Sequence, residues 1–186
     1  MRDEPFYRTL MNYINVAGVI VGLSASGRLA TSLMPTGSIL QMQGVSVQGF
    51  TTTNGTKAFD NTPFTSSQGS GFGLSVDLKP INSSNQIYVQ GDFYGGNDTG
   101  PQNSWGLFLA GSSSAIVAGG ENSFGLAGTT GPMGFTWKAT TVSAATTTYA
   151  VRLAGIGGTF TLNGTGGAGL YANSMVSSLT VWEVQS

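Results

Sequence analysis

The last ten residues, SSLTVWEVQS (residues 177–186), have the pattern of a β-strand rather than that of a polar tail. Side chains alternate between the two faces of a strand, so Leu179 and Val181 share one face while Trp182 and Val184 share the other. Both faces are partly apolar, which predicts a strand with neighbours on each side. Two arrangements satisfy this pattern: a strand covered by other subunits, and the central strand of a monomeric sandwich.

The sequence before this strand is also typical of β-structure. In GFGLSVDLK (residues 71–79) an apolar residue stands at every second position, as in a half-buried strand. Further strand-like segments are GSILQMQ, QIYVQGDFY, GFTWKA, TTYAVRLAG and GTFTLNG. Clusters rich in Gly, Asn, Ser and Thr separate them and predict turns and loops. We therefore expect an all-β fold, an antiparallel β-sandwich over residues 37–186.

The composition limits both function and partners. The 186 residues include only seven basic and eight acidic side chains, with a net charge of −1. A protein with so few charges tends to self-associate, so we expect much of its surface to be covered by partners. The basic residues are scattered, which argues against nucleic acid as the ligand.

The chain contains no Cys and no His. Disulfides, thiol nucleophiles, histidine triads and histidine-based acid–base chemistry are therefore excluded. We expect no cofactor, no metal and no catalytic residues, so the protein is not expected to be an enzyme. A polysaccharide-degrading enzyme is the alternative; for it, Asp92 and Asp98 are the only acids close together in the sequence outside the N-terminal segment.

The first 36 residues differ from the rest. Residues 1–15 have the only helix-like pattern, with Asp3 as a candidate cap and Pro5 in the first turn. So short an amphipathic helix must dock on something else, either a larger particle or its own downstream domain. We expect residues 1–36 to form a helical or extended anchor whose contacts are made by Phe6, Tyr7, Leu10, Met11, Tyr13 and Ile14.

The apolar run VAGVIVGLSASG (residues 16–27) follows this helix. It is shorter than the roughly 20 residues that cross a bilayer, so no membrane insertion is expected. A signal peptide is the alternative, but the acidic residues in MRDEP do not suit one. We expect a buried extended or β segment.

Four features occur in order after residue 36: the entry strand GSILQMQ, the patch FDNTPF, the segment VDLKPINSSNQIYVQGDF and the long C-terminal segment from TTYAVRLAG to SSLTVWEV. On these features the domain resembles the small C-terminal β-domain of bacteriophage fibre and virion-surface proteins. That module is similar to the trimeric jelly rolls of the C1q/TNF type. The resemblance covers most of the chain, but residues 1–36 have no counterpart in it.

The resemblance implies a homotrimeric jelly roll on a virion, joined through its N-terminus to other virion proteins of the tail, baseplate or capsid. Its final strand would lie near the three-fold axis, with the trimer interface at Leu179, Val181, Trp182 and Val184. The implied function is that of a short tail fibre that contacts the host surface. A capsid decoration or head fibre protein is the alternative, and a secreted C1q-like adhesin is a third.

The segment GDFYGGNDTGPQNSW (residues 91–105) is the most site-like stretch and is predicted to be a loop. Carboxylates and amides that bond hydroxyl groups, beside aromatic rings, suit recognition of a host glycan or receptor. The candidate contacts are Asp92, Tyr94, Asn97, Asp98 and Trp105. The alternative is a solvated loop with Trp105 in the core.

The segment GTGGAG (residues 164–169) matches the dinucleotide-binding spacing G-x-G-x-x-G. That motif requires a preceding strand and a following helix, whereas β-like sequence follows here. We expect a glycine-rich loop between strands.

Overall fold

The computed structural model describes residues 34–122, 128–139 and 143–186, together with the backbone of residues 13–16 and 19–22. Strands dominate these residues, and the only helical element among them is the short 3₁₀ turn η2 (Tyr171–Asn173). No helix in this part of the chain is long and apolar enough to cross a membrane. The prediction of an all-β fold is confirmed.

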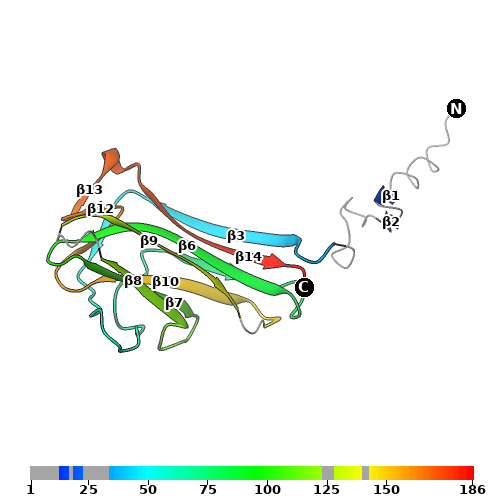
Figure 1. Cartoon of the computed structure of the whole chain (residues 1–186), viewed down its shortest axis with the longest axis horizontal. Helices are drawn as coiled ribbons and strands as arrows, with labels where there is room; N and C mark the ends of the chain where they lie inside the picture. The colour runs from blue at the N-terminus through cyan, green and yellow to red at the C-terminus, as the bar shows by residue number, and fades with distance from the viewer. Residues whose placement is uncertain (1–12, 17–18, 23–33, 123–127, 140–142) are drawn as a thin grey trace.

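Two antiparallel sheets form the two layers of the domain (Figure 1). The larger sheet is built around β14 (Val176–Val184), which pairs with β3 (Ile39–Gln48) on one side and β6 (Gln86–Asn97) on the other. The far edge of β6 pairs with β9 (Gly131–Lys138). Two short strands extend this sheet at one end, where β11 (Phe160–Leu162) pairs with the end of β6 and with β4 (Thr51–Thr53).

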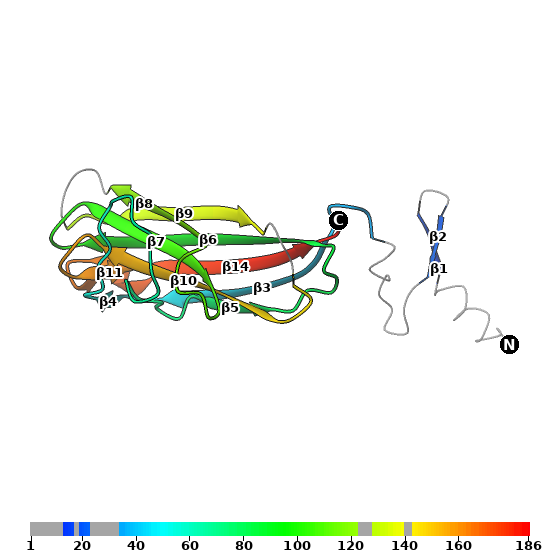
Figure 2. The same cartoon turned by 90° about the horizontal axis from the view of Figure 1, so that it is seen from below.

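The second sheet has four strands and lies in front when the molecule is seen from below (Figure 2). Its order is β5 (Ser75–Leu78), β10 (Thr147–Gly155), β7 (Gln102–Leu109) and β8 (Val117–Asn122). Two small hairpins complete the structure: β12 (Gly164–Thr165) with β13 (Ala168–Gly169), and β1 (Tyr13–Val16) with β2 (Val19–Gly22).

The core lies between the two sheets and follows the predicted alternation. Leu74, Val76 and Leu78 are buried, as the pattern of residues 71–79 predicted. The ring of Trp105 stacks on that of Phe135 in the opposite sheet, with 4.4 Å between the ring centroids. Alternate side chains of β6 and β14 face this core along most of each strand, as expected for the two antiparallel layers of a β-sandwich.

Two predictions of local structure are wrong. Residues 91–105 are not a loop, because β6 runs to Asn97 and β7 begins at Gln102. Glycine permits this extension: a Cβ atom at Gly95 would lie 2.3 Å from the ring of Phe160. The predicted helix over residues 1–15 is also wrong at Tyr13 and Ile14, which belong to β1.

The remaining positions of that predicted helix, residues 1–12, lie outside the described residues. The extended segment predicted for residues 16–27 is confirmed where the backbone is described, at Val16 and in β2. The glycine-rich loop predicted at residues 164–169 is also confirmed. It forms the turn between β12 and β13, with positive φ values at Gly166 and Gly167.

A buried carboxylate fixes the C-terminal end of β14. Glu183 is fully buried and accepts hydrogen bonds from the backbone N–H groups of Ile81 and Asn82, at 2.9 and 3.1 Å. The side chains of Asn85 and Gln41 donate two more, at 2.6 and 2.5 Å. Burial alone would raise the pKa of Glu183, but these hydrogen bonds outweigh it and hold the pKa below its ordinary value.

A second polar contact fixes the other end of β14. Asn163 is fully buried, and its amide donates to the carbonyl oxygens of Val47 and Gly49, at 2.8 and 2.9 Å. The hydroxyl of Ser177, in β14, donates to the amide oxygen of Asn163 at 2.6 Å. Both ends of the strand are thus held by polar groups whose hydrogen bonds are made within the chain.

The Glu183 network predicts an acid-dependent loss of stability. The pKa of the Glu183 carboxyl is lower in the folded than in the unfolded protein. The stabilisation of the fold by the ionised carboxylate is therefore complete above the unfolded-state pKa, and it is lost as the pH falls through the folded-state pKa. Glu183→Gln should lower the free energy of unfolding at neutral pH by about 2 kcal/mol or more.

Urea unfolding at neutral and at acidic pH measures this effect. The difference between the two proteins should narrow on acidification. If the difference were the same at both pH values, the stabilisation would not come from the ionised carboxylate.

Candidate functional site: the outer face of the sheet around β14

The outer face of the larger sheet is the surface that points away from the core. It consists of the side chains that alternate with the buried ones on four strands. These are Met42, Gly44, Ser46 and Gln48 of β3, Val176, Ser178, Thr180 and Trp182 of β14, Gln86, Tyr88, Gln90, Asp92 and Tyr94 of β6, and Pro132, Gly134, Thr136 and Lys138 of β9.

One continuous row of large side chains crosses this face. Met42, Trp182, Tyr88 and Lys138 occupy paired positions on the four neighbouring strands. The rings of Trp182 and Tyr88 are nearly parallel, with 5.8 Å between their centroids. The ammonium of Lys138 lies 5.8 Å from the centre of the Tyr88 ring, within the range of a cation–π contact.

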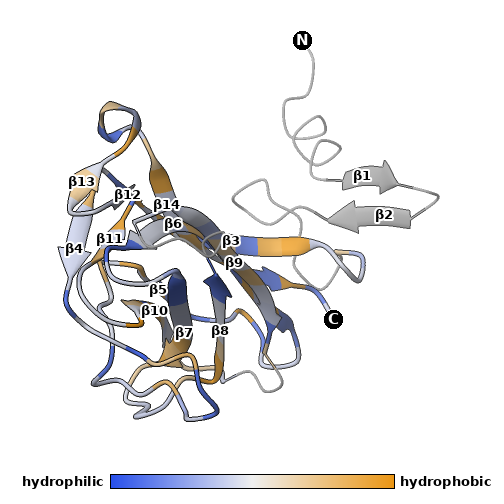
Figure 3. Cartoon of the chain, turned by 60° about the vertical axis from the view of Figure 1, so that its left-hand side comes forward, coloured by the Kyte–Doolittle hydropathy of each residue, from blue (hydrophilic) through white to orange (hydrophobic). Residues whose placement is uncertain are grey.

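This row leaves apolar surface exposed to solvent. Met42 is 63% exposed, and Ile39 at the start of β3 is 59% exposed. Figure 3 shows apolar stretches along β3 and β14, and those of β14 include Leu179 and Val181, which are buried in the core. Isolated exposed apolar residues are ordinary, but a row that crosses four strands is typical of an interaction surface.

The part of the outer face next to this row is polar and almost uncharged. The rows beside the aromatic one contain Thr180, Gln90 and Thr136, then Ser178 and Asp92. The Gln90 amide donates to the Asp92 carboxylate at 2.9 Å. Asp92 and Lys138 are the only charged side chains in the outer face as defined above. Such a surface suits a partner that is itself nearly neutral.

The predicted trimer contacts of the last strand need correction. Leu179 and Val181 are fully buried in the core of their own chain, and Val184 is nearly so. Their side chains therefore have no surface to offer another subunit. Trp182 differs, because it lies half-buried on the outer face. The prediction placed trimer contacts on both faces of β14, and of its four residues only Trp182 lies on the face that points away from the core.

The predicted glycan contacts do not come together as one site. Asn97 and Trp105 are buried, and the Trp105 ring is used in core packing, so these two assignments are wrong. Asp92 and Tyr94 are exposed on the outer face, whereas Asp98 lies in the turn after β6. Because side chains alternate between the two faces of β6, the predicted contact residues lie on different faces, whereas a loop could have brought them together.

The extended conformation of β6 also separates Asp92 and Asp98, the two acids predicted as candidates for catalysis. Asp92 and Asp98 are six positions apart along an extended strand and its turn, which corresponds to roughly 20 Å. Carboxylates that cleave glycosidic bonds lie within about 10 Å of each other. Among the described residues, no cluster of three or more acidic side chains could hold a metal ion.

The predicted anchor falls mostly outside the described part of the chain. Phe6, Tyr7, Leu10 and Met11 belong to residues 1–12, and for Tyr13 and Ile14 the structure gives only the backbone of β1. The anchoring role of all six residues stays a prediction.

Met42 and Tyr88 were not among the site residues predicted from the sequence. The signal was present, because each is a large side chain at a solvent-side position of an alternating strand. Neither a family model nor a curated protein matches this chain.

Neighbouring residues of β14 should differ sharply in their effect on stability. Leu179→Ala removes a fully buried side chain and should lower the free energy of unfolding by about 2–5 kcal/mol. Thr180→Ala alters only the outer face and should change it by less than about 0.5 kcal/mol. Urea titration of both variants tests this. Equal costs would mean that the two faces of β14 are assigned incorrectly.

Proposed function

We propose that the chain is a structural and adhesive protein of a bacteriophage virion. In this proposal three copies of the sandwich associate through the outer face around β14. Residues 1–36 attach the trimer to the tail or baseplate, and the far end of the domain contacts the host surface as a short tail fibre. The observation that carries the proposal is the partly exposed row of Met42, Trp182, Tyr88 and Lys138, which crosses an outer face with few charges.

The strand pairing supports a jelly roll, as in the family that the sequence resembles. Along the chain, the eight strands of the two layers are β3, β5, β6, β7, β8, β9, β10 and β14. The first pairs with the last, the second with the seventh, the third with the sixth and the fourth with the fifth. A jelly roll winds eight strands into two sheets in this nested manner.

The chemistry of the outer face favours further copies of the same chain as its partner. In a trimer with three-fold symmetry, residues close to the axis meet their own equivalents in the other two copies, so clustered charges of one sign there would repel one another. The outer face avoids this, because it carries one acidic and one basic residue, Asp92 and Lys138. Burial of Met42 and Trp182 would then remove apolar surface from water, which favours association.

One end of the domain is suited to attachment to a particle, and the opposite end is suited to contact with the host surface. The N–H groups of Gly37 and Gln185 donate to the carbonyl oxygens of Gln185 and Ser38, both at 2.8 Å. The chain therefore enters β3 beside its C-terminus, at one end of the sandwich. The hairpin of β12 and β13 lies at the opposite end (Figure 1). A particle bound through the N-terminal segment would leave that opposite end free.

Adhesion by such a protein would gain strength from multiplicity. Weak contacts repeated in each trimer, and in several trimers on each particle, raise the overall avidity without any new contact.

A capsid decoration or head fibre protein is the second candidate. The described residues hold one sandwich and no repetitive shaft, so the domain would reach only a short distance from the surface that carries it. Electron microscopy of intact particles, with an antibody against the domain, distinguishes tail from capsid.

The trimer is tested by charge insertion on the outer face. Met42→Lys should convert the trimer into monomers, because three buried ammonium groups would face one another around the axis. Ile156→Lys is the matched control, since Ile156 is 41% exposed but lies outside the outer face. Sedimentation should give three times the chain mass of 19.1 kDa for the wild type and for the control. A monomeric wild type would contradict the proposal.

The anchor is tested by deletion of residues 1–15. The truncated chain should remain a folded trimer but should no longer be incorporated into particles, because the deleted segment carries Phe6, Tyr7, Leu10 and Met11. Circular dichroism, sedimentation and assembly with particles that lack the protein measure the three properties. Unfolding or dissociation of the truncated chain would instead make the segment part of the core.

A further inference from the structure

A cleft lies between the loop of residues 57–64 and the strands β7 and β8, on the sheet opposite to the outer face. Its volume is about 520 Å³. This is within the range of small-molecule sites, about 300–1,000 Å³. Its lining includes Phe59, Asp60, Asn61, Thr62, Ala118 and Gly120.

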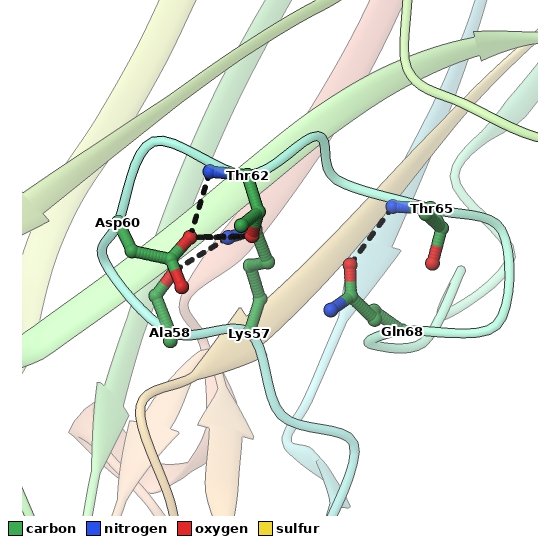
Figure 4. Close-up of polar contacts among 6 residues, drawn as sticks. All are labelled: Lys57, Ala58, Asp60, Thr62, Thr65 and Gln68. Atoms are coloured by element: carbon green, nitrogen blue, oxygen red, sulfur yellow. Dashed lines mark hydrogen bonds and ion pairs between the residues drawn. The ribbon is translucent and has the colours of Figure 1, made fainter.

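The wall of the cleft is held rigidly by a buried lysine (Figure 4). Lys57 is only 5% exposed, and its ammonium donates to the carbonyl oxygen of Ala58, the carboxylate of Asp60 and the hydroxyl of Thr62, at 2.7, 2.6 and 3.0 Å. An ammonium has three donors, so these contacts use all of them. Lys57 is therefore a brace for the loop rather than a group that binds an anion.

Asp60 completes this brace and leaves the cleft without net charge. Its Oδ1 atom accepts from Lys57 and from both the N–H and the hydroxyl of Thr62. The hydrogen bond from Lys57, followed by those from Thr62, holds the pKa of Asp60 far below its ordinary value. The carboxylate stays ionised opposite the ammonium, and Asp60 is among the residues that line the cleft.

The other end of the loop is fixed as well. Phe64 is buried and meets the ring of Phe108 edge to face, with 5.8 Å between the centroids. The N–H of Ala115 donates to the carbonyl oxygen of Phe64 at 2.8 Å. The loop is thus preorganised at both ends, which reduces the entropy cost of binding a ligand.

A large aromatic side chain projects from this rigid loop. Phe59 is 53% exposed. One edge of its ring packs against Gly120, where an added Cβ atom would lie 2.0 Å from the ring. A Cβ at Gly119 would likewise lie 2.6 Å from the ring of Trp105. At Gly119 and Gly120 the lining of the cleft has no side chain, and the Phe59 ring lies beside Gly120.

We infer that this cleft binds a neutral saccharide. A sugar ring has an apolar C–H face that packs on an aromatic side chain, and hydroxyl groups that bond carboxylate and amide oxygens. Phe59 supplies the ring, while Asp60 and Asn61 supply the polar groups. The internal neutralisation of Lys57 and Asp60 disfavours a charged ligand. The inference deepens the proposed adhesive function by naming a ligand class, and it rests on that function for its biological role.

Amide NMR spectra of the full chain, recorded during titration with single sugars, test the inference. The probes are the methyl glycosides of glucose, galactose and mannose, together with N-acetylglucosamine; N-acetylneuraminic acid and inorganic phosphate serve as anionic probes. At least one neutral sugar should shift the amide signals of Asn61, Gly119 and Gly120 with an affinity in the millimolar range. The affinity should be insensitive to salt.

Three variants and one control locate the site. Phe59→Ala should weaken binding about tenfold or more, because it removes the stacking surface. Ala118→Leu should weaken it by filling the cleft, and Asn61→Ala removes a polar partner without touching the Lys57 brace. Phe50→Ala, at another exposed aromatic residue, should bind like the wild type. Thermal unfolding of each variant checks its fold.

The inference is overturned if no neutral sugar shifts these amide signals, if an anionic probe shifts them more strongly, or if folded Phe59→Ala and Asn61→Ala proteins both bind like the wild type. Its failure is distinguishable from that of the proposed function. Loss of sugar binding in an intact trimer contradicts only this inference, whereas a monomer that still binds sugar contradicts only the proposed trimer.

Discussion

The structure depends on one strand that has two different faces. The core-facing side chains of β14, Leu179 and Val181, fill the space between the two sheets, and polar groups hold both ends of the strand. Its position between β3 and β6 means that it cannot shift along its axis without breaking both sets of strand pairs. A shift by one residue would also move the apolar side chains out of the core and Trp182 into it. The outer face, with its aromatic row, is therefore fixed by the same constraint that fixes the core.

Glu183 shows how this constraint is reinforced chemically. A buried carboxylate is costly unless every hydrogen bond it needs is made, and here neutral donors from β3 and from the segment between β5 and β6 supply them. The same residues that satisfy the charge join three segments that are far apart in the sequence. This arrangement favours specificity of the fold over simple hydrophobic burial.

Much of the fold could be predicted from the sequence. The alternation in residues 71–79 and 177–184 identified strands correctly, because a period of two is a local property of the chain. The prediction failed where glycine was decisive: Gly95 and Gly96 were taken as loop residues, yet they allow β6 to continue close to the ring of Phe160 and to the backbone of Thr129 respectively. The pattern also left open which face of β14 meets the core, because Trp182 and Val181 are both apolar.

The candidate sites were less predictable, because they depend on which strands become neighbours. Met42, Trp182, Tyr88 and Lys138 are scattered through the chain, and only the pairing of β3, β14, β6 and β9 brings them into one row. The cleft beside Phe59 likewise forms only because β8 lies next to the loop of residues 57–64, which is about sixty residues earlier in the sequence. Conversely, Asp92 and Trp105 are close in the sequence but end on the surface and in the core respectively.

The most direct test of the account is a distance measurement between copies of the outer face. The chain has no cysteine, so Thr136→Cys places a single spin label on that face, and Ser113→Cys places one on a loop of the opposite sheet. Pulsed electron paramagnetic resonance should then give a short distance between labels at position 136, with the signature of three coupled spins, and a longer distance at position 113. No dipolar signal from either label, or a shorter distance at position 113, would contradict an assembly in which sister copies cover the face around β14.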